Sequence, residues 1–142
     1  ASGSAHSETE PPRVGSKTDT PLARMLLLKN AAVSTSGDAE QYVEIDGKRY
    51  SHIVDPRTGV GLTERLQVSI ISRWATDTDA FATATCVLGV ERGLALLESQ
   101  PHLAAVFIRK RGTDSEVFCS KRLNAYLQTK SGVKSANDMI TY

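Results

Sequence analysis

Cysteine is scarce in this sequence, and its placement excludes several kinds of site. Cys86 and Cys119 are the only 2 cysteines among the 142 residues, and neither belongs to a Cys-x-x-Cys pair or a Cys/His cluster. The common zinc sites and dithiol redox pairs need such spacing. We therefore expect two buried thiols, with a disulfide between them as the alternative.

A surplus of charge and a long apolar run are missing as well. Lys plus Arg number 17 against 16 for Asp plus Glu, so the net charge of +1 gives no electrostatic reason to expect binding to nucleic acid or to an acidic membrane. The longest apolar run, Met25–Leu28, ends at Lys29, far short of the roughly 20 residues that a membrane span needs. With 40% hydrophobic and 23% charged residues, the composition predicts a soluble globular chain.

Large apolar side chains are nearly absent from the N-terminal segment. Val14 is the only one in residues 1–20, which are rich in Ser, Thr, Glu and Pro. Such a segment buries too little surface to offset the entropy of ordering it. We expect residues 1–22 to be a flexible polar tail or linker and residues 23–142 to form one unit. The chain starts Ala-Ser-Gly-Ser without an initiator Met, so we also expect an excised or processed product.

Strand and turn signals fill the next part of the chain. Arg24–Val33 is apolar enough for a buried strand or a short helix, and we predict a strand. The polar run Ser34–Asp38 predicts a turn that ends it. Asp46-Gly47 between the β-forming segments Tyr42–Ile45 and Arg49–Val54 is typical of a β-hairpin.

Helical spacing marks the middle of the sequence. Apolar residues recur at this spacing from Thr76 to Leu88, and Thr76 with Asp79 resembles a capping box. A second helix is predicted at Glu91–Glu98, after Gly89. Further strands are predicted at Leu66–Ser72, with its polar side facing solvent, and at Ala104–Arg109 and Glu116–Cys119. The sequence therefore predicts an α+β domain with a mixed or antiparallel sheet and two main helices.

Asp79 and Thr83 are candidates for holding a metal ion. They lie four residues apart on a predicted helix, so their oxygen atoms project from one face, about one turn apart. Such oxygens suit Mg²⁺, which takes few protein carboxylates and completes its shell with water and phosphate oxygens. The alternative is that Asp79 stabilises the helix N-terminus through the macrodipole and Thr83 simply packs.

A second group of candidates follows the predicted hairpin. Asp55-Pro56-Arg57-Thr58-Gly59 places a carboxylate and a guanidinium at a strand end, where backbone donors, Arg57 and His52 could surround a phosphate. One alternative is an ordinary Pro-Gly loop with a surface ion pair. For His52, the other alternative is a core histidine bonded to backbone atoms.

Three motifs in this order closely resemble those of one protein family. They are the Thr-Ser-Gly element in Ser34–Asp38 (STSGD), Asp46–Gly59 (DGKRYSHIVDPRTG) and Asp79–Thr83 (DAFAT), followed by Val87-Leu88-Gly89. Together they resemble the ApbE-type flavin transferases, formerly called thiamine-biosynthesis lipoproteins. The resemblance covers roughly Leu26 to Ile108.

The resemblance implies a reaction and a cofactor. FMN would pass from FAD to a Ser or Thr hydroxyl of a target protein, forming a phosphodiester and releasing AMP. Mg²⁺ would be the cofactor, with Asp79 and Thr83 matching metal ligands. Some family members carry a further acidic residue where this chain has Ala82, so we expect weaker cation binding here.

The same resemblance places the flavin nucleotide beside the His-x-x-Asp segment. His52, Val54, Asp55 and Arg57 are the residues expected to bind FAD, Val54 through its backbone. His52 and Asp55 are the expected catalytic residues, which would orient the phosphate or accept the hydroxyl proton. Which of these two accepts the proton stays open at this point.

The partners and location implied by the resemblance are those of a bacterial flavinylation system. They are FAD, an acceptor protein with a flavinylated Thr or Ser, and an N-terminal half of the same protein that this chain lacks. The surface left uncovered by that half predicts self-association. The family implies a periplasmic protein, or one anchored on the outer side of the inner membrane. Two other functions stay open: an FAD pyrophosphatase giving FMN and AMP, and a non-catalytic module that binds flavin nucleotide or a partner.

Overall fold

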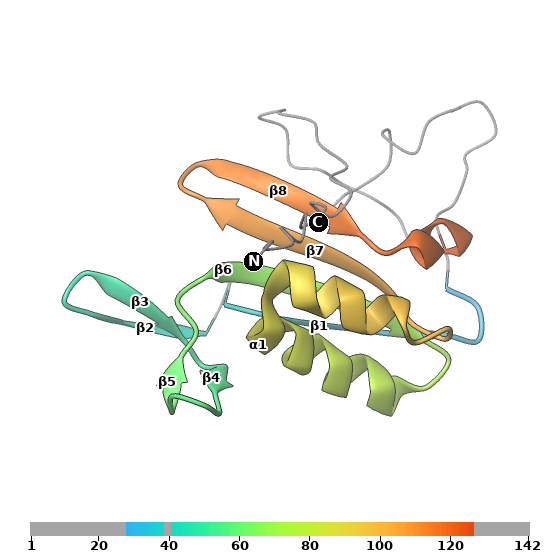
Figure 1. The fold of residues 1–142 in the computed structure, drawn as a ribbon, viewed down its shortest axis with the longest axis horizontal. Helices are drawn as coiled ribbons and strands as arrows, with labels where there is room; N and C mark the ends of the chain where they lie inside the picture. Colours follow the sequence, from blue (N-terminus) through green and yellow to red (C-terminus); the bar gives the residue numbers. More distant parts are fainter. Residues whose placement is uncertain (1–27, 39–40, 127–142) are drawn as a thin grey trace, which may run out of the picture.

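A four-stranded antiparallel sheet with a helix on one face forms the body of the protein (Figure 1). The computed structural model describes residues 28–38 and 41–126. The strand order is β1-β6-β7-β8. The four strands are β1 (Ala32–Gly37), β6 (Arg65–Ser72), β7 (Ala104–Arg111) and β8 (Asp114–Cys119). The predicted α+β class with an antiparallel sheet is confirmed, and so are the predicted strands at β6, β7 and β8.

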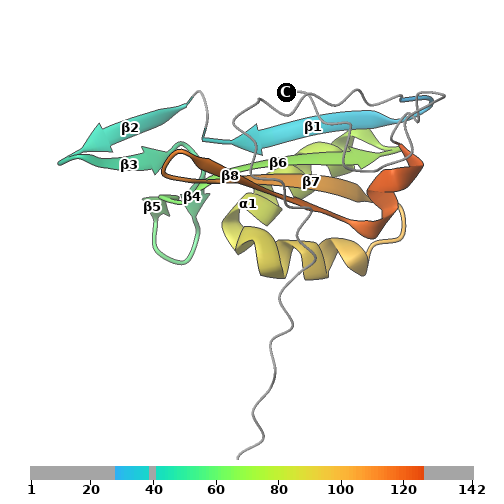
Figure 2. The same ribbon diagram turned by 90° about the horizontal axis from the view of Figure 1, so that it is seen from above.

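Two apolar clusters cover the two faces of this sheet. On the face of helix α1 (Ala75–Glu98), the side chains of Val68, Ile70 and Phe107 are fully buried. On the other face, a smaller cluster forms around Ile71 and Leu123, the latter in the 3₁₀-helix η1 (Lys121–Ala125). Figure 2 shows α1 on one side of the sheet. Burial of apolar surface on both faces holds the body together.

Strand β6 departs from its expected alternation of buried and exposed residues. The sequence predicts that its polar side faces solvent, but Ser69 is 2% exposed and Ser72 is 0% exposed. That prediction is wrong because β6 lies inside the sheet and Ser69 shares the face of Ile71, which the second apolar cluster covers. The hydroxyl of Ser69 is satisfied by Thr35 Oγ1 at 2.8 Å.

Strand β1 overturns the predicted turn at Ser34–Asp38. Residues 34–37 pair with β6, with Ser34 opposite Ile70 and Gly37 opposite Gln67. Hydroxyl side chains favour turns because they bond nearby backbone, but here they bond across elements, so tertiary contacts override the local preference. Of the strand predicted at residues 24–33, residues 24–27 lie outside the described residues, and the strand itself begins only at Ala32.

Two small hairpins project beyond the end of the sheet (Figures 1 and 2). The hairpin of β2 (Tyr42–Ile45) and β3 (Lys48–Ser51) confirms the prediction at Asp46-Gly47. Asp46 has φ 53° and Gly47 has φ 72°, as a tight hairpin turn requires. The predicted second strand is shorter than expected, because the chain turns after Ser51. Residues Val54–Asp55 (β4) then pair with Val60–Gly61 (β5), on either side of the predicted Pro-Gly break.

The two predicted helices are the two halves of α1. Gly89 interrupts the helix with φ 75° and ψ 178°, a conformation that essentially only glycine adopts. The predicted capping box is wrong, because the residue that precedes the helix is Trp74 and no side chain caps this end. By length and composition alone, α1 could cross a membrane. The break at Gly89 and the packing of α1 against the sheet are typical of a core helix.

The cysteines form no disulfide with each other. Cys86 on α1 is buried and Cys119 on β8 is half-buried, so the expectation of thiols rather than a disulfide is confirmed. Burial, followed by the nearby charge of Asp38, raises the pKa of Cys86 to about 12. A thiol with this pKa is inert at neutral pH.

The tail predicted at residues 1–22 lies outside the described residues.

Candidate functional site

A row of hydroxyl groups joins β1 to the first half of α1. Ser36 Oγ lies 3.1 Å from Thr83 Oγ1, and Ser34 Oγ lies 2.8 Å from Thr78 Oγ1. Ser34 and Ser36 share one face of the strand because they are two residues apart. The contact between Ser36 and Thr83 is exposed, whereas Thr78 is fully buried. The Thr-Ser-Gly element therefore lies beside the predicted metal ligand Thr83.

The chemistry of Asp79 and Thr83 fits a hard cation. Both residues are exposed on α1 and lie one helical turn apart, so both oxygen atoms are accessible. Among the described residues, no group of three or more His, Cys, Asp or Glu side chains is placed to hold a metal. A cation at Asp79 and Thr83 would therefore need oxygen ligands other than a cluster of described carboxylates. Mg²⁺ commonly binds in this way, with substrate phosphates in its shell.

His52 is exposed, so it is not the core histidine of the alternative interpretation. Its ring Nδ1 lies 3.1 Å from the carbonyl oxygen of Gln41, and its backbone N–H donates to the same oxygen at 3.2 Å. A carbonyl oxygen only accepts hydrogen bonds, so Nδ1 carries the proton and the neutral ring keeps its lone pair on Nε2. This nitrogen can accept a proton.

Asp55 and Arg57 form a two-pronged ion pair at the tip of the β4–β5 hairpin. Arg57 Nε donates to Asp55 Oδ1 at 3.0 Å, and Nη2 donates to Oδ2 at 2.7 Å. The backbone N–H of Arg57 also donates to Oδ1, at 2.9 Å. These hydrogen bonds from Arg57 lower the pKa of Asp55 to about 2, so the carboxyl group is ionised at neutral pH. The side chain of Arg57 remains 64% exposed.

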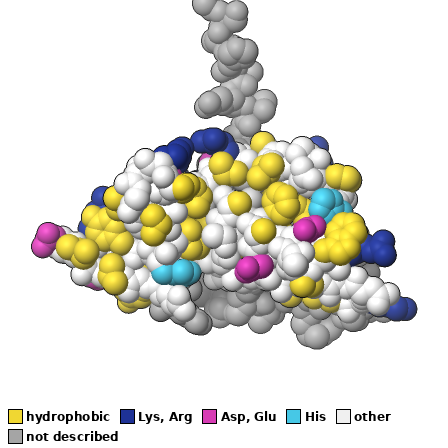
Figure 3. Space-filling view, turned by 90° about the horizontal axis from the view of Figure 1, so that it is seen from below, with side chains coloured by type: hydrophobic (Ala, Val, Ile, Leu, Met, Phe, Trp, Pro, Cys, Tyr) yellow, Lys and Arg dark blue, Asp and Glu magenta, His cyan; other side chains and the backbone are white. Residues whose placement is uncertain are grey.

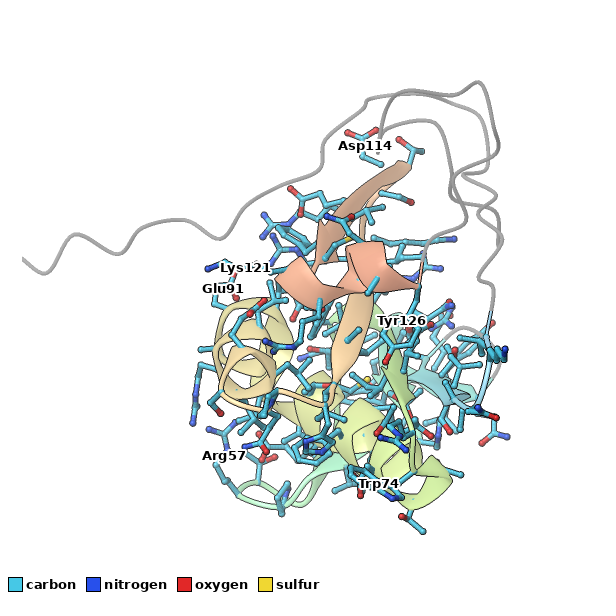
Figure 4. All side chains as sticks on the ribbon, turned by 90° about the vertical axis from the view of Figure 1, so that its right-hand side faces the viewer. Arg57, Trp74, Glu91, Asp114, Lys121 and Tyr126 are labelled. Atoms are coloured by element: carbon cyan, nitrogen blue, oxygen red, sulfur yellow. The ribbon has the colours of Figure 1, made fainter. Side chains whose placement is uncertain are left out.

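The β4–β5 hairpin and the start of α1 lie at opposite ends of the molecule in Figure 1. Seen end-on, Arg57 and Trp74 both lie in the lower part of Figure 4. Figure 3 shows that histidine and acidic side chains share this lower face. Val54, the predicted backbone contact for FAD, is 49% exposed in β4. The structure thus brings Thr83 to Ser36 directly, and places His52 in the link between β3 and β4 and Arg57 in the turn between β4 and β5.

Sequence reasoning missed Ser36 as a neighbour of Thr83. The sequence of Ser34–Asp38 predicts a turn, which would place its hydroxyls away from a helix 40 or more residues later. The available signal was the spacing of two between Ser34 and Ser36, which puts both hydroxyls on one face of a strand.

A sequence model of the ApbE family matches residues 1–107. This chain belongs to the ApbE family. An FAD:protein FMN transferase of Klebsiella pneumoniae (strain 342) is 42% identical over 90 residues, which cover 63% of this chain and 28% of that protein. One of Treponema pallidum (strain Nichols) is 45% identical over 87 residues, which cover 61% of this chain and 24% of that protein.

Solved ApbE structures share the fold of this ApbE-family chain. The Pseudomonas stutzeri flavinyl transferase ApbE, in its apo form, has a TM-score of 0.66 and 34% identity over 84% of this chain and 38% of that one. The ApbE protein of Thermotoga maritima has a TM-score of 0.65 and 30% identity over 85% of this chain and 40% of that one. The ApbE-family chain therefore spans about a quarter of the curated relatives, at 28% and 24%, and well under half of the solved ones.

Proposed function

We propose that this chain carries the metal and pyrophosphate side of an FAD:protein FMN transferase. The reaction would move FMN from FAD to a Thr or Ser hydroxyl of an acceptor protein and release AMP. The observation that carries the proposal is the contact of 3.1 Å between Ser36 and Thr83, which gathers exposed oxygen atoms one helical turn from Asp79. The names of the relatives, FAD:protein FMN transferase, support the choice of substrate.

Asp79 and Thr83 would hold Mg²⁺ through a carboxylate and a hydroxyl oxygen. When bound, the cation would neutralise negative charge on the pyrophosphate. Ser36 would keep the Thr83 hydroxyl in place through their hydrogen bond. With Ala82 beside Thr83 rather than an acidic residue, the described part of the chain offers one carboxylate, Asp79, at this pair, so cation and nucleotide should bind together rather than separately.

His52 is the better candidate for the general base, and Asp55 is the weaker one. A carboxylate with a pKa of about 2 has little tendency to take a proton at neutral pH. Nε2 of neutral His52 has its lone pair available, because Nδ1 donates to Gln41. The acceptor oxygen would form a bond to the FMN phosphorus while the bond from that phosphorus to the AMP oxygen breaks. The hydroxyl proton would pass to His52 Nε2.

Asp55 would then act by orienting Arg57. Its two oxygen atoms bind Nε and Nη2 of the guanidinium, so Nη1 is left to meet a phosphate oxygen. Val54, next to Asp55 in β4, would contact the nucleotide through its backbone. Arg57 is positively charged at neutral pH, as a guanidinium always is, and its hydrogen bond to Asp55 raises its pKa further.

The acceptor determines which of two reactions takes place at this site. A Thr or Ser of a partner protein gives flavinylation, whereas water gives FMN and AMP, as in an FAD pyrophosphatase. A bacterial periplasmic or membrane-anchored location would suit flavinylation of a membrane-associated acceptor protein. Self-association of the chain stays a prediction, and the exposed apolar side chains of β2 provide a surface for it.

The proposal is tested by titrating this 142-residue chain with FAD, with and without Mg²⁺. Flavin fluorescence measures binding, and chromatography measures AMP. Magnesium-dependent binding with AMP release supports a complete transferase or pyrophosphatase site, and a Thr-containing acceptor that becomes fluorescent distinguishes the two. If the chain binds FAD without magnesium dependence or AMP release, the non-catalytic module is the better description.

A further inference from the structure

The β2–β3 hairpin, which leads into His52, has few described ties to the rest of the molecule. All four residues of β2 are exposed. A two-stranded hairpin is marginally stable by itself in water. At one end, the backbone N–H of Ser51 donates to the carbonyl of Leu62 at 2.8 Å. The position of His52 therefore depends on what else holds β3.

Arg49 of β3 provides a second tie, to the end of β1. Its Nε lies 3.1 Å from Asp38 Oδ2, and its Nη2 donates to the backbone carbonyl of Asp38. Asp38 is 8% exposed, so this ion pair is largely shielded from water. The guanidinium carbon also lies 3.3 Å from the centre of the Tyr42 ring, so a cation–π contact adds to the ion pair. Arg49 thus has a fixed geometry that a flexible lysine would not reproduce.

Asp38 is itself held by the segment that contacts α1. Ser36 bonds Thr83 at 3.1 Å, and the thiol of Cys86 donates to the carbonyl of Ser36 at 3.5 Å. Gly37 lets β1 approach β6 closely, since an added Cβ would come within 2.9 Å of the carbonyl oxygen of Leu66. These contacts hold the end of β1 beside Thr83, and they therefore also fix the position of Asp38, the next residue after the strand.

We propose that Arg49 is a positioning residue: its ion pair with Asp38 fixes the position of His52 relative to Thr83. The contacts form one path. His52 lies three residues after Arg49, and Arg49 forms an ion pair with Asp38. Asp38 lies two residues after Ser36, which hydrogen-bonds to Thr83. The inference rests on the proposed function, because only that function requires His52 and Thr83 to act on the same substrate. Transfer needs the proton acceptor and the phosphate held together, and small errors in such geometry are costly.

The test uses the 142-residue chain with Arg49→Gln, Asp38→Asn and the double variant. Each single variant should raise amide hydrogen exchange across residues 48–54 by about tenfold while leaving β6 and β7 protected. Each should also weaken magnesium-dependent FAD binding by roughly tenfold. The double variant should be no worse than the more damaging single one, because two residues that act as one unit are not additive.

Two control variants separate positioning from general loss of stability. Ser120→Ala removes the buried hydrogen bond of 2.8 Å to the backbone of Ala105, at a distance in sequence from either hairpin. It should lower the Tm without changing FAD affinity. Lys48→Gln removes the exposed charge next to Arg49 and should change neither binding nor exchange.

Several outcomes would overturn the inference. They are normal FAD binding by Arg49→Gln, additive effects of the two substitutions, or an equal loss of binding in Ser120→Ala. If the unmodified chain binds no FAD, the proposed function fails separately. The exchange measurement then decides the role of Arg49, and unchanged protection of residues 48–54 in Arg49→Gln would refute it.

Discussion

The sheet body and the projecting hairpins are held by different forces. Phe107 in the body is fully buried, whereas Val43 in β2 is 58% exposed. The ion pairs of Arg109 and Arg57 also differ in exposure. Arg109 in β7 is 5% exposed and bonds Glu116 at 2.8 Å, while the side chain of Arg57 at the β4–β5 tip is 64% exposed. Stability thus resides in the body, and the candidate phosphate contacts lie on the part that contributes little to it.

The largest expected effect on stability is in the body. Phe107→Ala should lower the free energy of unfolding by about 3–5 kcal/mol, since the ring fills the core against α1 and Gly93. Chemical denaturation measures this change. Val43→Ala in the exposed hairpin should cost no more than about 0.5 kcal/mol. Comparable losses from the two variants would contradict the division between body and hairpins.

The next largest effect concerns the break in α1. Gly89→Ala should cost about 1–3 kcal/mol, because φ 75° and ψ 178° are strained for any residue with a Cβ. Thermal unfolding measures this loss. Alanine is otherwise the best helix former, so a gain in stability would indicate that the helix is continuous at this point.

Asp79→Ala should leave the free energy of unfolding within about 0.5 kcal/mol of its original value, because Asp79 is exposed. It should abolish magnesium-dependent FAD turnover in an active form of the protein. Asp77→Asn is the control for loss of a negative charge near the start of α1, and turnover should persist in it, because Asp77 lies 3.2 Å from His102 Nε2 rather than beside Thr83. Turnover that persists in Asp79→Ala would end the assignment of this residue as a metal ligand.

His52→Ala should weaken FAD binding more than it lowers the Tm, because the ring is exposed and bonds only backbone in the described contacts. His52→Asn separates two roles of the ring. Its amide can still donate to Gln41, but it has no basic nitrogen, so binding should recover while AMP release stays low. Equal AMP release by His52→Asn and the unmodified chain would exclude His52 as the base.

The ion pair at the β4–β5 tip makes stability depend on pH through the titration of Asp55. Its pKa is about 2 in the folded chain, below the ordinary 3.8, so the pairing with Arg57 favours folding above the ordinary value. That contribution is lost as the pH falls from about 4 through 2. Carboxyl NMR should show Asp55 titrating near 2, and Arg57→Gln should move the pKa back up. An unchanged pKa in Arg57→Gln would show that another group holds it down.

The candidate site was partly predictable because its residues lie in local motifs. His52, Asp55 and Arg57 fall within six consecutive residues, and Asp79 and Thr83 within one helical turn, so sequence spacing alone groups each set. What joins the sets was not predictable. Ser36 and Thr83 are 47 residues apart, much farther than the members of any one motif. No local pattern predicts that their hydroxyl groups meet.

The sequence by itself determined the elements whose signals are local. The Asp46-Gly47 turn, the helical spacing around Ala82 and the β-forming segments of β6, β7 and β8 follow from preferences within a few residues. Only the tertiary structure decided that Ser34–Gly37 is a strand, that Ser69 is buried, and that Asp38 forms an ion pair with Arg49. The physical reason is that hydroxyl and charged side chains suit a turn or solvent equally well. Their final partners depend on which distant segments pack against them.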